Sequence, residues 1–422
     1  LLEIMQYWQA VRGRSLGSID WGHILGLTWR RGDEVVTNLS RPNRPDLDAV
    51  PFPARELLPP LEAYAPYADT VAGTMRVKAS IMSSRGCPFH CNFCAIISFY
   101  GDAGGKPWRG RSVENVVAEM VELKERFGAS HFEFQDDNFF VRPDRALAIV
   151  EAFARTGHDY SFAFLTRADQ IVRGERYFPA LRQAGLRYVS VGIESGSEAS
   201  LERMVKQTTV AANRRALEIL HENDVAAQVE FIMFEPQSTL EDLALNLQFI
   251  EEQGLFGYFP PLILGNLLLM PGTPVRAQME RELGVAGNIH EVLPYRFSDP
   301  WVTEIKNLLG EFQSRMGNAW FGLAFELLDG IPAQEIRLRQ EGAARVNGSP
   351  NPQALLRQMA QLKLEFFALT RIPYALLRSA IRSAQAGEPI PVEALLQRAE
   401  VELREVRGRV RELLGATAPA GG

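Results

Sequence analysis

The sequence predicts an α/β fold: a partial (β/α)6, TIM-like barrel with an N-terminal linker segment and a C-terminal helical region. The first observation behind this prediction is that short apolar runs alternate with helical patterns between about residues 76 and 285, as βα units around a parallel sheet do. The second is that strand patterns vanish beyond about residue 300, where helical periodicity dominates. The alternation alone fits an open doubly wound sheet equally well, so the motifs at the strand ends have to decide.

The first 75 residues differ from the rest and are interpreted as the remnant or linker of an upstream domain. Two short runs, Ile24–Leu27 and Glu34–Val36, flank the polar segment Trp29–Asp33, which suggests a small hairpin. A proline-rich stretch follows and suggests a linker packed against the barrel. The regions expected along the chain are this segment at 1–75, the barrel at 76–290, a helical domain at 291–415 and a disordered tail at 416–422.

Six βα units account for the barrel region. The predicted strands are Val77–Met82, His131–Gln135, Ser161–Thr166, Tyr188–Gly192, Gln228–Met233 and Leu262–Leu269. The predicted helices are Val113–Phe127, Asp144–Thr156, Arg176–Ala184, Val210–Asn223 and Leu240–Gln253, with a further helix after Pro274.

Composition restricts the partners and the compartment. A formal net charge of −6 and a pI near 5.7 disfavour nucleic acid as the main partner, because phosphate backbones are bound by basic faces. No run of about 18 apolar residues indicates a membrane span, and no signal peptide is visible. The three cysteines all lie within eight positions, which is a poor disulfide framework but a good metal site. We therefore expect a reducing, cytoplasmic compartment.

The cysteines form a C-x3-C-x2-C pattern directly after the first predicted strand, with Cys87, Cys91 and Cys94 as its members. Thiolates suit iron–sulfur clusters. Three of them leave one iron of a four-iron cluster without a protein ligand, and a catalytic metal centre needs such an open position. The alternative is a zinc site in a non-enzymatic protein, with His90 as the fourth ligand.

The segment Arg85–Cys94 resembles the signature of the radical S-adenosylmethionine (SAM) superfamily, including the aromatic Phe93 before the third cysteine. The resemblance implies that the three cysteines hold a [4Fe-4S] cluster and that SAM chelates the open iron through its amino and carboxylate groups. It also implies reductive cleavage of SAM to a 5′-deoxyadenosyl radical, and an electron donor such as flavodoxin or ferredoxin. Phe93 would then line the adenine pocket, with a plain core aromatic as the alternative.

Polar motifs follow the second and third predicted strands, at the edge where a barrel places its active site. Asp136, Asp137 and the amide of Asn138 could accept hydrogen bonds from the SAM ammonium or hold a substrate, with capping of the next helix as the alternative. Arg167 could bind the SAM carboxylate in bidentate fashion. A structural pair of Arg167 with Asp169 or Asp137 is the alternative there.

Further motifs follow the later strands. Glu194 and Ser195 stand in a Gly-Ile-Glu-Ser-Gly segment that resembles the family's fourth-strand motif and suits the ribose hydroxyls or the amino acid part of SAM. Lys206 lies in the family's Lys-x-Thr-Thr context, where helix capping and function are both open. The turn at Phe234–Thr239 departs from the family's Gly-x-Pro-Gly-Glu-Thr pattern, which indicates a locally different pocket. Met270 lies in a segment resembling the sixth-strand contact with adenine, with entry into a helix as the alternative.

Residues 26–36 and 47–55 resemble the linker that joins a cobalamin-binding domain to the barrel. That class includes the anaerobic magnesium-protoporphyrin monomethyl ester cyclase and many C-methyltransferases. Its Asp-x-His-x-x-Gly motif is absent from these 422 residues, so we expect most of the cobalamin domain to be missing and cobalamin to bind only in the complete protein. No fourth cysteine is present, which excludes a second thiolate cluster and a methyl-carrying cysteine.

Together these motifs predict a radical SAM enzyme that acts on a small-molecule substrate by C-methylation or oxidative cyclisation. Two alternatives remain: a radical SAM enzyme that modifies RNA or peptide, and a zinc-binding protein without enzymatic activity. The sequence assigns no catalytic acid or base, no particular substrate and no oligomeric state.

Overall fold

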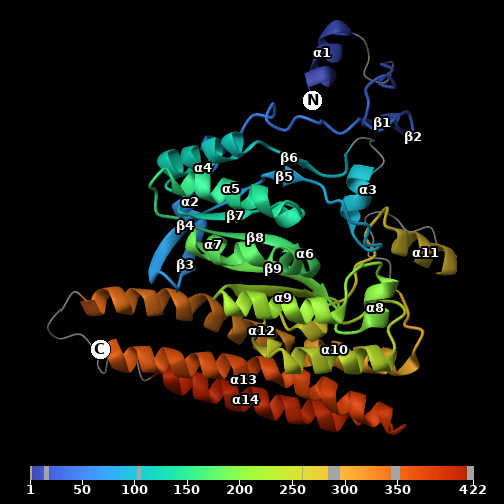
Figure 1. Ribbon diagram of the computed structural model, residues 1–422. Coiled ribbons are helices and arrows are strands. Elements are labelled where there is room, and N and C mark those ends of the chain that lie inside the picture. Colours follow the sequence, from blue (N-terminus) through green and yellow to red (C-terminus); the bar gives the residue numbers. More distant parts are fainter. Residues whose placement is uncertain are drawn as a thin grey trace.

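The computed structural model describes residues 2–13, 19–101, 106–258, 260–283, 295–343 and 352–415 (Figure 1). The tail for which we predict disorder, 416–422, lies outside the described residues. The described elements fall into a small N-terminal segment, a sheet flanked by helices, and long helices toward the C-terminus.

A six-stranded sheet forms the centre of the molecule, in the order β10-β9-β8-β7-β4-β3. The pairs from β4 to β10 are parallel, as strands joined by helical crossovers are. β3 is antiparallel to β4 and adds one edge strand. The curled half-barrel and the C-terminal helices confirm the predicted fold class. The strands are β3 (Pro66–Asp69), β4 (Thr74–Ile81), β7 (His131–Phe134), β8 (Ser161–Arg167), β9 (Leu186–Glu194) and β10 (Ala226–Phe231).

Helices and turns connect the strands (Figure 1). Several helices begin at a hydroxyl cap: the side chains of Ser112, Thr209 and Thr239 each accept a backbone N–H three residues on. The helices are α3 (Ala95–Gly101), α4 (Val113–Phe127), α5 (Pro143–Ala154), α6 (Ala168–Arg173), α7 (Phe178–Gln183), α8 (Glu198–Arg203), α9 (Val210–Glu222), α10 (Leu240–Glu252) and α11 (Pro274–Leu283). The 3₁₀ turns are Arg55–Leu57, Phe139–Val141, Glu175–Tyr177, Leu255–Gly257 and Leu262–Leu264.

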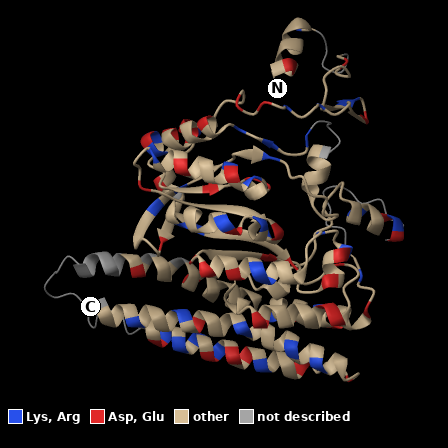
Figure 2. Ribbon diagram, in the orientation of Figure 1, with Lys and Arg blue, Asp and Glu red and all other residues tan. Residues whose placement is uncertain are grey.

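Three long helices form the C-terminal part: α12 (Pro300–Ala343), α13 (Pro352–Gln385) and α14 (Val392–Gly415). α13 packs against both α12 and α14, and α12 also contacts β3, β4 and α10. Charged residues of both signs are interspersed along α13 and α14 (Figure 2). Trp320 of α12 is fully buried, and its Nε1 donates to Leu369 O at 2.9 Å.

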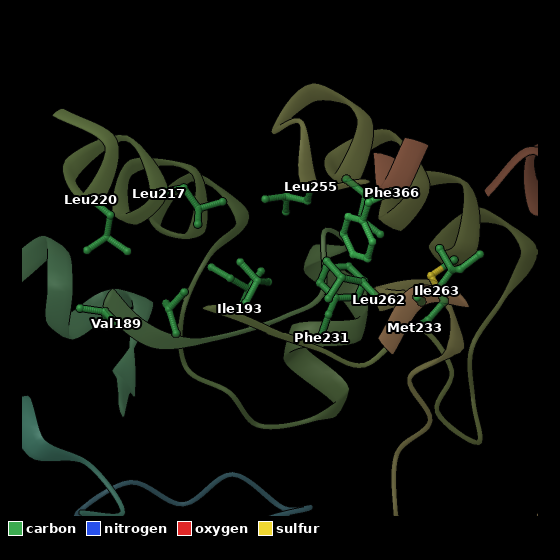
Figure 3. Close-up of a cluster of buried hydrophobic side chains, with 14 of the residues drawn as sticks. Val189, Ile193, Leu217, Leu220, Phe231, Met233, Leu255, Leu262, Ile263 and Phe366 are labelled. Carbon is green, nitrogen blue, oxygen red and sulfur yellow. The ribbon is translucent and has the colours of Figure 1, made fainter. Parts of the chain in front are cut away.

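One apolar core joins the sheet to these helices. Val189 and Ile193 of β9 lie beneath α9, and Phe366 of α13 lies near Phe231 and Leu255 (Figure 3). Burial of such side chains provides the main favourable term for packing α13 on the barrel. In the described part of the chain, no helix is long and apolar enough to span a membrane.

The sixth predicted strand, Leu262–Leu269, does not form as a strand. It begins with a 3₁₀ turn, and an isolated bridge between Phe234 and Asn266 links it to the segment that follows β10. The backbone N–H of Leu262 donates instead to the Tyr374 hydroxyl of α13 at 3.2 Å. The contact with α13 therefore holds this apolar run at the position where a sixth parallel strand would otherwise begin.

The N-terminal segment contains α1 (Leu2–Ala10), the hairpin β1 (Thr28–Arg31) and β2 (Glu34–Thr37), and α2 (Leu61–Tyr64). The first arm of the hairpin starts four residues later than Ile24, because the chain turns at Gly32, whose φ is +61°. Arg55 Nη2 donates to Ser80 O at 2.6 Å, so the proline-rich stretch lies beside the carboxyl end of β4, beyond Val77, where its pairing with β3 ends.

Candidate active site at the cysteine loop

The three cysteines lie on the loop between the short strand β5 (Ser84–Arg85) and α3, beyond the carboxyl end of β4 (Figure 1). β5 pairs with β6 (Arg109–Gly110) in a separate two-stranded ladder. Cys91 is buried, Cys87 and Cys94 are half-buried, and all three thiols are free. Burial raises the pKa of Cys87 and of Cys94. One short loop thus presents three unoxidised thiols at the edge of the half-barrel that the parallel strands point toward.

Hydrogen-bond donors surround the cysteine sulfurs. Arg167 Nη1 lies 3.1 Å from Cys91 Sγ, and Asn138 Nδ2 lies 4.0 Å from Cys87 Sγ. The backbone N–H of Phe89 also bonds to Cys87. Such donors stabilise a thiolate, which is the form of cysteine that binds metals.

Neighbouring segments anchor this loop. Asp137 Oδ2 accepts the N–H of Gly86 at 2.7 Å. Gly86 has a φ of +85°, and an added Cβ there would lie 1.8 Å from Pro107 O, so only glycine fits. Farther along, Asn92 Nδ2 donates to Arg203 O at 2.7 Å. The cysteine loop is therefore tied to the end of β7 and to α8.

The three thiols have the donor chemistry of iron–sulfur cluster ligands. In the part of the chain that the structure describes, no group of three or more His, Cys, Asp or Glu side chains is arranged to hold a metal ion. In a [4Fe-4S] cluster each cysteine sulfur binds a different iron, so the three thiols match in number and in donor chemistry.

The two aspartates after β7 have different surroundings. Asp136 is buried, and its carboxylate accepts from the Ser83 N–H and Ser83 Oγ, both at 2.6 Å, and from Ser84 Oγ. Burial raises the pKa of Asp136 and of Asp137. Neither aspartate caps the next helix, since the N-cap of α5 is Arg142. Asp136 thus fixes the turn between β4 and β5, and its oxygens are already occupied by protein donors.

Arg167 makes the structural pair with Asp169 that the sequence offered as an alternative, with Nε 2.8 Å from Asp169 Oδ1. Its guanidinium also lies 4.0 Å over the Phe89 ring and donates to the backbone oxygen of Lys206. Together with the Cys91 contact, these bonds fix the guanidinium against the cysteine loop.

Glu194 ends β9 in a strained conformation. Its φ is +63°, in the left-handed region that residues other than glycine rarely adopt. Glu194 Oε1 accepts from Lys206 Nζ at 2.6 Å, and both side chains are buried. An added Cβ at Gly192 would come within 2.7 Å of Glu194 Oε1 and 2.9 Å of Lys206 Nζ. The ion pair therefore occupies the space that the missing Cβ of Gly192 leaves. Backbone strain such as that of Glu194 concentrates at functional sites.

Residues 81–250, which include the cysteine loop and the ends of β4 to β9, match the sequence model of the radical SAM superfamily. The chain contains a radical SAM domain.

Relatives of this radical SAM domain include methyltransferases and a cyclase. The chain is 31% identical over 229 residues to an uncharacterized methyltransferase of Pyrococcus horikoshii, covering 54% of this chain and 47% of that protein. It is 29% identical over 160 residues to the anaerobic magnesium-protoporphyrin IX monomethyl ester cyclase of Rubrivivax gelatinosus, covering 38% and 28%. The chain thus spans less than half the length of these relatives.

A solved structure shows a similar fold. The cobalamin-dependent SAM radical enzyme OxsB, with aqua-cobalamin and SAM bound, matches with a TM-score of 0.60 and 16% identity, over 95% of this chain and 66% of that chain. At this identity the match establishes the shared architecture of the radical SAM domain and the helices that follow it.

The remaining predicted contacts of the radical SAM domain differ in exposure. Ser195 is fully buried, and its Oγ donates to Asn246 Oδ1 at 2.7 Å. Phe93 is half-buried and packs on an apolar cluster that includes Met204. Met270 is exposed. A contact of each with SAM stays a prediction, and Ser195 would first have to release Asn246.

The fold brings two further polar residues to the site. Asn138 follows the aspartates after β7 and lies beside Cys87, with its Oδ1 accepting from Thr166 Oγ1 at 2.8 Å. The sequence left it undecided whether Lys206 caps a helix or has a function at the site, and in the structure its side chain pairs with Glu194. The sequence places the Asn138 amide with Asp136 and Asp137 in a polar run directly after a parallel strand, and a contact of Asn138 with SAM or a substrate stays a prediction.

Proposed function

We propose that the chain is the catalytic part of a radical SAM enzyme that C-methylates or oxidatively cyclises a small molecule. The observation that carries the proposal is the cysteine loop, where three free thiols with N–H donors lie beyond the strand ends of a radical SAM domain. The names of the methyltransferase and cyclase relatives support the two reaction types.

In this proposal Cys87, Cys91 and Cys94 ligate a [4Fe-4S] cluster, and SAM binds its open iron. When bound, these cofactors supply a 5′-deoxyadenosyl radical after one-electron reduction, and the protein positions them and excludes water. Arg167 holds the Cys91 sulfur by a charge-assisted hydrogen bond. The Glu194–Lys206 pair supports the end of β9 beside it.

Two further parts of the proposal concern partners. A one-electron donor of the flavodoxin or ferredoxin type would reduce the cluster. Cobalamin would be bound in the complete protein, as it is in OxsB, whose fold this chain shares.

The first test is anaerobic reconstitution with iron and sulfide, followed by iron and zinc analysis and electron paramagnetic resonance. We expect about four irons per chain, as one [4Fe-4S] cluster requires, and their loss in Cys91→Ala. Phe99→Ala is the matched control, because Phe99 lies on the adjacent α3 and is exposed, and it should retain the iron. Stoichiometric zinc without iron would contradict the proposal and favour the non-enzymatic alternative.

The second test identifies the products formed from SAM. The reduced, reconstituted protein should form 5′-deoxyadenosine from SAM. S-adenosylhomocysteine formed in addition, with a candidate substrate and added cobalamin, indicates methyl transfer. An active enzyme that yields 5′-deoxyadenosine and no S-adenosylhomocysteine would exclude methylation and leave cyclisation.

A further inference from the structure

Two arginines lie opposite each other on the small ladder that leads into the cysteine loop. Arg85 of β5 pairs in register with Arg109 of β6. Directly opposite residues of an antiparallel pair project from the same face, with Cβ atoms about 5 Å apart. The ladder therefore places two positive charges side by side, and Arg85 precedes Gly86 and Cys87 in the chain.

Arg109 is buried, with 7% of its surface exposed, and most of its N–H donors have no hydrogen-bond partner among the described residues. Its Nη1 donates to Arg44 O at 2.8 Å, and its guanidinium lies 5.2 Å from the centre of the Tyr100 ring. Nε and Nη2 are buried without a hydrogen-bond partner. Burial lowers the pKa of Arg109, as expected for a cation without a counter-ion.

No carboxylate of the described residues forms an ion pair with Arg85 or Arg109. Asp137 is close enough to Arg85 to feel its charge, but its Oδ2 accepts the backbone N–H of Gly86. Arg167 shows the contrast, because its guanidinium is equally buried and bonded to a carboxylate, a sulfur and a carbonyl. A buried donor left unsatisfied, and like charges placed directly opposite, both destabilise a fold.

We propose that Arg85 and Arg109 bind the oxyanionic group, a carboxylate or a phosphate, of a small-molecule ligand other than SAM. An oxyanion satisfies the free guanidinium donors and neutralises the pair. Within the proposed function, on which this exclusion of SAM rests, the SAM carboxylate is held by iron, and SAM has no second anionic group.

A cavity beside Arg85 indicates the rest of the ligand. Its volume is about 290 Å³, close to the lower end of small-molecule sites. Its surface is mostly apolar, with Phe52 from the linker and Ile81 from the end of β4. Arg85 also lines it, as do Arg111 and Glu119, which pair with each other. The ligand class that fits is amphiphilic: an apolar body in the cavity with its anionic group at Arg85, whose ladder partner Arg109 lies outside the cavity lining.

The test is calorimetric titration of the full chain with inorganic phosphate and with acetate, against sodium chloride of equal ionic strength. We expect binding of at least one oxyanion, weakened at least tenfold in Arg109→Met. Arg155→Met is the control, since Arg155 lies exposed at the end of α5, and it should bind like the wild type. Equal binding by wild type and Arg109→Met, or none by either, would overturn the proposal.

Stability and competition give independent readouts. Without added anion, Arg109→Met should melt no lower than wild type, and phosphate should raise only the wild-type melting temperature. A large loss of stability in Arg109→Met would mean that the contacts of Arg109 with Arg44 O and the Tyr100 ring outweigh its unsatisfied donors, and would refute the site. SAM that displaces phosphate would refute the assignment to another ligand. Because phosphate binding needs no iron, its outcome is separate from that of the cluster test.

Discussion

Replacement of Lys206 by methionine is expected to destabilise the radical SAM domain strongly. The Lys206 and Glu194 side chains are 5% and 9% exposed and lie 2.6 Å apart. Removal of one partner leaves the other charge buried and uncompensated, which costs about 3–5 kcal/mol. For a domain of this size, that loss corresponds to a fall in melting temperature of roughly 6–20 °C.

The assay is thermal unfolding of the full chain followed by circular dichroism, for Lys206→Met, Glu194→Gln and the double variant. The double variant should recover most of the stability that either single variant loses, because replacing both charges of a buried pair is close to neutral. Gly192→Ala should cost less than either single variant, since its Cβ would meet only the far ends of the Glu194 and Lys206 side chains, at 2.7 and 2.9 Å. Melting of Lys206→Met within about 3 °C of wild type, equivalent to about 1 kcal/mol, would refute a tightly buried pair, as would additive losses in the double variant.

Three further predictions follow from the described contacts. Arg167→Met removes the 3.1 Å bond to Cys91 Sγ and should lower the midpoint potential of the reconstituted cluster in a spectroscopic redox titration. Arg167→Lys keeps the positive charge and should restore part of the lost potential. Midpoint potentials equal to that of wild type in both variants would contradict the hydrogen bond. Burial opposes ionisation of Asp69, but bonds from Arg187 and other donors outweigh it and lower its pKa to about 2, so its contribution is present above pH ~4 and lost toward pH ~2. The urea midpoint of wild type should therefore approach that of Asp69→Asn over that range, and a constant difference would speak against it. Trp320→Ala empties a fully buried site and should cost about 3–5 kcal/mol in urea unfolding; a change below about 1 kcal/mol would show that the C-terminal helices repack around it.

Local signals predicted much of the barrel. The bounds of α4, Val113–Phe127, are those expected from the sequence, because Ser112 caps its start and Gly128 ends it in a left-handed conformation. The C-x3-C-x2-C spacing likewise predicted one loop with three thiols, since all its members are close in sequence. The Arg167–Asp169 pair was within reach for the same reason, as its partners are two residues apart.

What the sequence did not predict depends on distant contacts. Leu262–Leu269 has the composition of a strand, but the backbone N–H of Leu262 bonds to Tyr374 of α13, more than a hundred residues away, and not to a neighbouring strand. The pairing of Glu194 with Lys206 depends on the loop after α8 returning over Gly192. Periodicity reports which face of a segment is apolar, and it carries no information about which distant element covers that face.

The helix α12 has a consequence for how this half-barrel could change in evolution. A closed barrel has its radius set by the number and stagger of its strands. Here the sheet stops at β3 on one edge and β10 on the other, while α12 touches β3 and β4 and also contacts α10, which follows β10. The distance between the β3 edge and the β10 edge of the sheet therefore depends on the volume of the α12 side chains that pack between them. Substitutions along α12 could widen or narrow the chamber gradually while every strand keeps its register and the cysteine loop keeps its place.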